Sequence, residues 1–230
     1  MKTRIMVVVL LAAFVIISLF QTVQAQEIRT DKKGIKADKM AIRDDRRDVD
    51  RLSDLIMKWD RLRKGNDQAA LNQVEAMIAA ELRNDLIEAQ RETIESKKEA
   101  RKSNAEVRRS KKEAKKERRD KDHDKRALKD DMRDLRDDKR DLKDDARDAQ
   151  KTEELLLQKR TVAKELVALQ KEIDDPGKKG DKILQEKQRS LLEKYLDLSQ
   201  QEINMGIREV REDKQELRED RREVREDKKK

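Results

Sequence analysis

Apolar residues recur every seven positions in two stretches of this chain, with charged residues between them. The heptad RDLRDDK at 133–139 returns as RDLKDDA at 140–146, and REVREDK occurs at 208–214 and again at 222–228. Such a spacing places the apolar residues along one side of an α-helix and fits no strand pattern. The repeats therefore predict helices that lie along a partner through a thin apolar stripe.

Residues that break or cap helices gather at two places. Lys64-Gly65-Asn66-Asp67 offers a Gly that can end a helix and then N-cap candidates, and the segment 174–181 (DDPGKKGD) ends in another candidate cap, Asp181. These two turns predict three helices, at about 35–63, at 68–173 and from Lys182 towards the C-terminus. The second would be about 160 Å long, which no compact domain holds.

Apolar residues are densest on either side of each turn, which predicts two helical hairpins that share the long helix. The fold class expected is all-α and elongated, with hairpins around one very long central helix and charged heptad segments like those of single helices. Trp59 and Tyr195 lie inside the apolar stripes and are interpreted as packing residues. The expected organisation is a signal peptide at 1–25, an N-terminal hairpin at 26–95, a basic helical segment at 96–127 and a C-terminal hairpin at 128–230.

The apolar residues of the repeats are the candidates for helix pairing: Leu128, Leu135, Leu142, Val210, Leu217 and Val224. Folding of the second hairpin symmetrically about Pro176 would set Leu142 opposite Val210 and Leu135 opposite Leu217. Each repeat has a basic residue after its Leu or Val and an acidic one before it, so antiparallel pairing sets like charges together, whereas parallel pairing sets opposite charges together. We therefore expect self-association as a homodimer, or pairing with another helical protein.

The N-terminus has the pattern of a secretory signal peptide. Lys2 and Arg4 precede a charge-free run at 5–20, and Val23 and Ala25 stand where a signal peptidase needs small residues. We expect cleavage after Ala25 and export, most simply into a periplasm, with secretion as the other destination. An uncleaved anchor is the alternative, although the run is short for a membrane span.

Composition limits what such a chain can build. Charged residues make up 49% of the sequence and aromatic residues 2%, so an ordinary globular core is excluded. Strict periodicity, a single Pro and only five Gly favour long helices over disorder. The absence of Cys excludes disulfides and a lipid-anchored cysteine.

The sequence lacks the usual residues of an active site. Its one His, His123, stands in a fully charged stretch, and no glycine-rich phosphate loop or nucleophile motif is present. Adjacent acids such as Asp144 and Asp145 diverge by about 100° on a helix, whereas Ca²⁺ needs six to eight converging oxygens. We expect no catalytic residue, cofactor, metal or small-molecule substrate.

Basic residues are concentrated between Lys97 and Arg119, here called the basic band. Four acids in this stretch oppose twelve basic residues, which leaves a net charge of +8, as large as that of the whole chain. A localised charge of this kind favours binding to a polyanion, and a solvated helix face is the alternative. The basic residues are Lys97, Lys98, Arg101, Lys102, Arg108, Arg109, Lys111, Lys112, Lys115, Lys116, Arg118 and Arg119.

Residues 103–111 of the basic band resemble the basic region of leucine-zipper transcription factors. Ser103 and Glu106 stand where that family has its base-reading Asn and a small Ala, so we expect no specific reading of DNA. In composition the chain is also similar to the tentacled periplasmic chaperones of outer-membrane proteins, which are exported, basic and helical.

Two functions are thus expected of an exported, non-enzymatic helical protein. The first is a scaffold, spacer or interaction protein. The alternative is a chaperone-like or polyanion-binding protein that holds anionic lipid or lipopolysaccharide.

Overall fold

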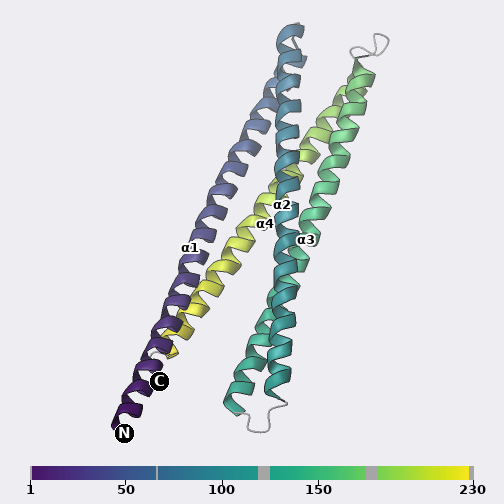
Figure 1. Ribbon diagram of the computed structural model, residues 1–230. Coiled ribbons are helices and arrows are strands. Elements are labelled where there is room, and N and C mark those ends of the chain that lie inside the picture. The colour runs from purple at the N-terminus through teal and green to yellow at the C-terminus, as the bar shows by residue number, and fades with distance from the viewer. Residues whose placement is uncertain (1, 66, 119–124, 175–180, 228–230) are drawn as a thin grey trace. The chain divides into compact units, whose positions relative to one another are not determined.

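A computed structural model shows an all-α chain (Figure 1). It describes the backbone of residues 2–65, 67–118, 125–174 and 181–227, and their side chains except at 2–31, 125–127, 130, 216, 219–220 and 223–227. Within these residues the elements are α1 (Lys2–Arg63), α2 (Gln68–Glu117), α3 (Lys125–Ile173) and α4 (Lys182–Asp227). Among the residues whose side chains are described, no helical segment is long and apolar enough to cross a membrane.

The chain divides into two compact units. The central unit comprises 48–202, and the terminal unit combines 1–47 with 203–230. Both α1 and α4 contribute to each unit.

The helix boundaries lie where the sequence predicts them at both turns, although residues 175–180 of the second turn, with Pro176, lie outside the described residues. At the first turn the Gly65 N–H donates to the Leu62 carbonyl at 3.0 Å, and the Asp67 carboxylate accepts from the Ala70 N–H at 3.0 Å. At the start of α4 the Asp181 carboxylate accepts from the Ile183 N–H at 2.8 Å. Each Asp satisfies a backbone donor that the first turn of a helix leaves without a partner.

The structure does not have the single helix expected from Gln68 to Ile173. α2 ends at Glu117, α3 begins at Lys125, and the two helices pack antiparallel as a hairpin (Figure 1). The sequence between them has neither Gly nor Pro, although it is rich in Asp, which favours caps and turns over helix interiors. The physical reason for the hairpin is burial, because a straight helix would leave the facing stripes of both halves in water.

Small residues on α2 form the contact surface of this hairpin, here called the seam. Ala89, Thr93, Ser103 and Ala114 are buried at spacings of four, ten and eleven residues, which keep them on one side of α2, and α3 contributes buried Leu135, Ala149, Thr152 and Leu156. Two hydrogen bonds fix the register: the hydroxyls of Ser103 and Ser110 donate to the carboxylates of Asp145 and Asp138. Small side chains on α2 let the helices approach closely and leave room for the leucines of α3.

Apolar side chains on both sides of each predicted turn form the core of the central unit, as the sequence predicts. Trp59 and Tyr195 are 1% and 0% exposed, which confirms both as packing residues. Trp59 also donates from Nε1 to the Glu75 carboxylate at 3.1 Å, and the Arg63 guanidinium lies 4.8 Å from the centre of its ring. The core includes Leu52, Leu55, Ile56, Val74, Ile78, Leu82, Leu155, Leu166, Leu169, Leu191 and Leu192.

In the terminal unit, α1 packs against the second half of α4. Ile35, Val210 and Leu217 form a buried cluster, and Ile42 packs against it. A Cβ added to Gly206 would lie 3.2 Å from Cγ1 of Ile42. Gly206 therefore lies where α1 approaches α4 closely, which accounts for a glycine inside a helix despite its cost of about 1 kcal/mol.

Candidate functional site

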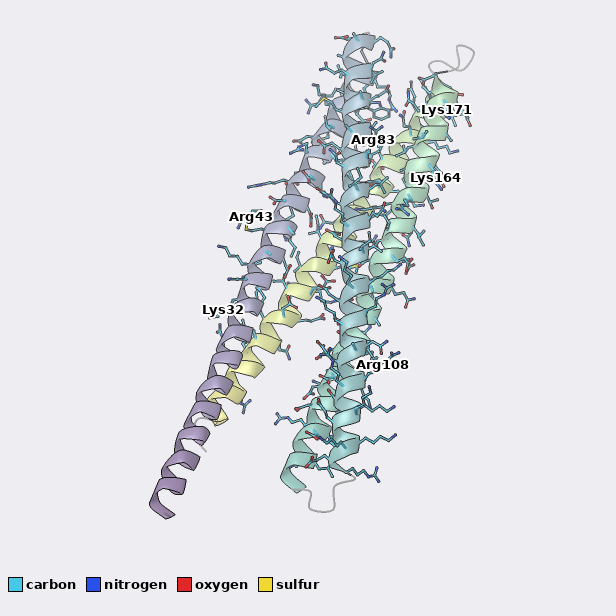
Figure 2. All side chains as sticks on the ribbon, in the orientation of Figure 1. Lys32, Arg43, Arg83, Arg108, Lys164 and Lys171 are labelled. Carbon is cyan, nitrogen blue, oxygen red and sulfur yellow. The ribbon has the colours of Figure 1, made fainter. Side chains whose placement is uncertain are left out.

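The basic band lies on α2 within the central unit, and its charged side chains project away from the seam. Arg108 is labelled among them in Figure 2. Arg119 lies outside the described residues. Among the other eleven, Lys97 is half-buried and the remaining ten are exposed: Lys98, Arg101, Lys102, Arg108, Arg109, Lys111, Lys112, Lys115, Lys116 and Arg118.

Few acids neutralise the band within the described part of the chain. Lys97 reaches Glu153 of α3 at 2.7 Å, and Lys98 reaches Glu95 of its own helix at 2.6 Å. From Arg101 to Arg118, none of the basic side chains forms an ion pair with a described carboxylate within 4.0 Å. From Arg101 to Arg118 the band is thus an exposed and largely unneutralised positive stretch of α2, although exposed Glu106 and Glu113 lie within it.

The predicted pairing residues have partners that the sequence did not indicate. Leu135 is buried and Leu128 and Leu142 are half-buried on α3, whose described partner is α2. Val210 and Leu217 cluster with Ile35 of α1, although Leu142 and Leu135 were expected opposite them. The side chain of Val224 lies outside the described residues.

The expectation of a homodimer rested on this apolar stripe. Because Leu135, Val210 and Leu217 are buried within the chain, they are not exposed to a second copy. Leu128 and Leu142 are only half-buried, and self-association stays a prediction.

A buried lysine is the most unusual feature of the central unit. The Lys159 side chain is 0% exposed, and its ammonium lies 2.9 Å from Oδ2 of Asp85 and also contacts the Glu202 carboxylate. The Tyr195 hydroxyl donates to the same Oδ2 at 2.5 Å, and the lysine nitrogen lies 5.7 Å from the centre of the tyrosine ring. These four residues, here called the buried network, connect α2, α3 and α4.

Burial and the neighbouring charges together raise the pKa of three groups in the buried network. Desolvation opposes the charged form of Lys159, but the negative charges of Glu202 and Asp85 outweigh it and raise the lysine pKa above its ordinary 10.5. Burial raises the pKa of Glu202, and Lys159 partly offsets that effect. Burial and the nearby Asp85 raise the pKa of Tyr195 well above its ordinary 10.0.

The raised pKa values of Tyr195 and Lys159 lower the stability of the folded state at alkaline pH. Above about pH 10 the folded protein keeps protons on Tyr195 and Lys159 that the unfolded chain releases, so stability is lost as the pH rises. Replacement of Tyr195 by Phe should make this loss less steep by up to about 1.4 kcal/mol per pH unit. Urea denaturation of both proteins, followed by circular dichroism at increasing pH, measures the difference.

Tyr195 is the only tyrosine of the chain, so tyrosinate absorbance reports its ionisation directly. We expect the folded protein to show no tyrosinate signal until it unfolds. A normal titration near pH 10 in the folded protein would contradict the network geometry.

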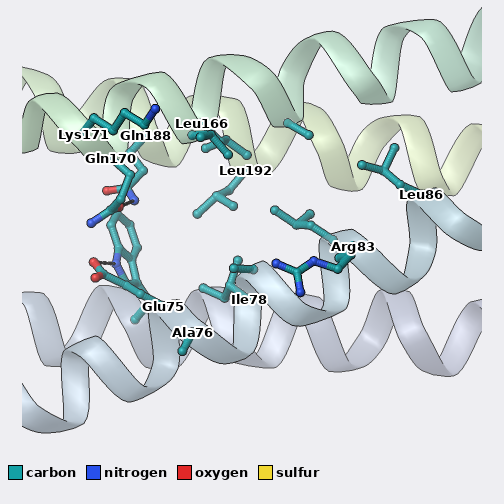
Figure 3. Close-up of a pocket in the computed structure, with 15 residues that line it drawn as sticks. Glu75, Ala76, Ile78, Arg83, Leu86, Leu166, Gln170, Lys171, Gln188 and Leu192 are labelled. Atoms are coloured by element: carbon teal, nitrogen blue, oxygen red, sulfur yellow. Dashed lines mark hydrogen bonds between the residues drawn. The ribbon is translucent and has the colours of Figure 1, made fainter.

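A groove opens in the central unit between the first half of α2 and the last part of α3 (Figure 3). Its volume is about 550 Å³, and its floor includes the buried side chains of Trp59, Ile78, Leu82, Leu166 and Leu192. Exposed Arg83 of α2 and Lys171 of α3 also line it. The groove is therefore apolar below and basic at its rim.

Sequence reasoning missed both the buried network and the groove. Lys159 could have been found, because it stands three residues after Leu156 and three before Val162, in the middle of an apolar stripe. A charged residue at such a position predicts a buried partner of opposite charge. The groove left no such signal in the sequence, since alanines such as Ala79 and Ala163 occur on exposed helix faces as readily as at a cavity wall.

Comparisons with family models, with curated proteins and with solved structures find no match to this chain. Among the described residues, no group of three or more His, Asp or Glu side chains is placed to hold a metal ion.

Proposed function

We propose that this chain is an exported, non-enzymatic helical interaction protein that binds an anionic surface through the basic band. The observation that carries the proposal is the exposed, largely unneutralised positive face of α2 from Arg101 to Arg118. Localised positive charge on a rigid helix attracts phosphate-bearing surfaces such as anionic lipid or lipopolysaccharide.

The packing of α2 supports the proposal because one face of the helix packs against α3 and the other face carries the basic side chains. Small residues of the seam, such as Ser103 and Ala114, hold α2 against α3. Long basic side chains occupy the remaining face and stay in water. The hairpin thus holds the positive face in place without using its charges.

Export supports an extracytoplasmic surface as the target. The proposal of export rests on the basic N-terminus, the charge-free run at 5–20 and the small residues Val23 and Ala25. The mass of the protein recovered from secreting cells tests it, with a mature chain beginning at Gln26 as the expected result.

Charge reversal in the band should abolish surface binding. Four simultaneous replacements by Glu, at Arg108, Arg109, Lys111 and Lys112, should weaken binding to anionic vesicles roughly a thousandfold, since each basic residue near such a membrane contributes about 1 kcal/mol. Binding by the unaltered protein should also fall steeply with added salt. Vesicle co-sedimentation across a salt series measures both effects.

The matched control reverses four exposed lysines of the central unit that lie outside the band: Lys58, Lys164, Lys187 and Lys194. It carries the same change in net charge, so it separates a local site from the overall charge. Helicity should be unchanged in both variants, because Glu is as good a helix former as Lys. If both variants weaken vesicle binding equally, or if the unaltered protein does not bind at low salt, the basic band is not a binding site. The scaffold or spacer function would then replace the proposal.

A further inference from the structure

The groove between α2 and α3 interrupts an otherwise regular contact between these helices. Along this flank of the hairpin, Lys97 reaches Glu153 at 2.7 Å, and one heptad away Arg160 donates to Gln90 at 2.9 Å. One more heptad in the same register brings Arg83 opposite Val167. Val167 is 59% exposed and has no polar group to offer, so the series of cross-helix polar pairs ends at the groove.

Two cations therefore stand at the groove without an acidic partner. Neither Arg83 nor Lys171 forms an ion pair with a described carboxylate, and both line the groove. Figure 3 shows the Arg83 side chain extending along α2 towards Ile78, and Lys171 beside Gln170 on α3. These two side chains are available to an anion that enters the groove.

Other polar groups of the lining already have partners. Glu75 accepts from the indole N–H of Trp59, and the Gln188 amide donates to Gln170 at 2.8 Å. A ligand in the groove thus needs no hydrogen-bonding groups along its length. It needs an apolar body for the floor and one negatively charged end for the basic rim.

The size of the groove selects among ligands of this description. It extends about 15 Å along α2, from Ala76 to Leu86, and its volume of about 550 Å³ lies within the range of small-molecule sites. A single alkyl chain lying along α2 fits this length and volume.

We propose that this groove binds a single-chain anionic amphiphile, with the alkyl chain on the apolar floor and a carboxylate or phosphate head at the basic rim, at Arg83 or Lys171. Burial of the chain removes apolar surface from water, and the guanidinium binds a planar carboxylate or a phosphate through paired N–H donors. A fatty acid and an alkyl phosphate share this chemistry. The inference goes beyond the proposed function, because the groove and the basic band occupy different parts of α2.

Trp59 provides a direct test, since it is the only tryptophan of the chain and lies on the groove floor. A brominated long-chain fatty acid, added below its critical micelle concentration, should quench the fluorescence of Trp59 with saturation. The corresponding brominated alcohol should bind at least about tenfold more weakly, because it has no charge for the two cations. Displacement by an unlabelled alkyl phosphate compares the two head groups: tighter displacement assigns a phosphate ligand, and weaker displacement a carboxylate.

Two variants locate the ligand. Replacement of Arg83 and Lys171 by Glu should weaken binding of the fatty acid at least about tenfold, whereas the matched replacement of Lys164 and Lys187 should leave it unchanged. Ala79→Phe, at an exposed position on the groove wall, should prevent quenching by filling the space.

Four results would overturn the inference: no saturable quenching, equal binding of the acid and the alcohol, equal effects of the two charge-reversal pairs, or undiminished quenching in Ala79→Phe. Binding of an acidic amphipathic peptide in place of the fatty acid would do so too. Failure of vesicle binding by the basic band leaves all of these readouts intact.

Discussion

Replacement of Lys159 by Met is expected to destabilise the protein by about 3 to 5 kcal/mol at neutral pH. The methionine preserves much of the buried stem but removes the ammonium, so Asp85 and Glu202 lose the positive charge that lies between them. Removal of one partner from a buried charge pair is costly because the other charges stay desolvated and unpaired. Urea denaturation at pH 7 measures the loss.

The pH dependence of this variant identifies the cause. Burial raises the pKa of Glu202, and without Lys159 the charge that partly offsets this effect is lost, so the folded variant binds more protons than the unfolded chain. Stability of the variant should therefore increase as the pH falls from 7 towards the ordinary carboxyl range, and the deficit relative to the unaltered protein should shrink.

Lys164→Met is the matched control for Lys159→Met. Lys164 is an exposed lysine of the same helix, and its replacement should change stability by less than about 0.5 kcal/mol. Equal effects of the two replacements, or a deficit in Lys159→Met that does not vary with pH, would show that the network does not act as described.

Replacement of Leu135 by Asp should open the seam and cost at least about 3 kcal/mol. Leu135 is 7% exposed on α3 and packs in the hairpin with α2, so the change removes a core side chain and buries a carboxylate without a partner. Ion pairs on the outer face of α3, such as Arg147 with Asp144 at 3.0 Å, should persist. Much of the helicity should therefore survive even where the helices separate.

Hydrogen exchange resolves this effect by region. Amides of α2 between Ser103 and Glu117 should lose protection in Leu135→Asp, while those around Trp59 should keep most of theirs. The control is Met132→Asp, three residues earlier on the same helix, where the side chain is 40% exposed. Loss of protection in both variants would place the cause in added charge rather than in the seam.

Local signals in the sequence determined the helical class and two of the turns. Gly65, Asp67 and Asp181 act within a few residues of their own positions, through backbone hydrogen bonds that any surrounding fold would allow. The dense apolar stripes beside these turns, which include Trp59 and Tyr195, could also be assigned to a core from the sequence. A side chain that large is rarely left in water along a regular stripe.

Only the tertiary structure decided which stripes meet. The division of 68–173 into α2 and α3 depends on a seam of Ala, Ser and Thr, residues that look the same on a buried and on a solvated helix face. The burial of Val210 against Ile35 joins residues 175 positions apart, and no spacing within one helix encodes that choice.

The buried network and the groove also arise only in the tertiary structure. Asp85, Lys159 and Glu202 come from three helices, and their charges become a network only when packing removes water from all of them. The groove exists because Ala79 and Ala163 leave space that their neighbours do not fill. Helix formation is local and can be derived from sequence spacing, whereas burial and cavity volume are sums over distant parts of the chain.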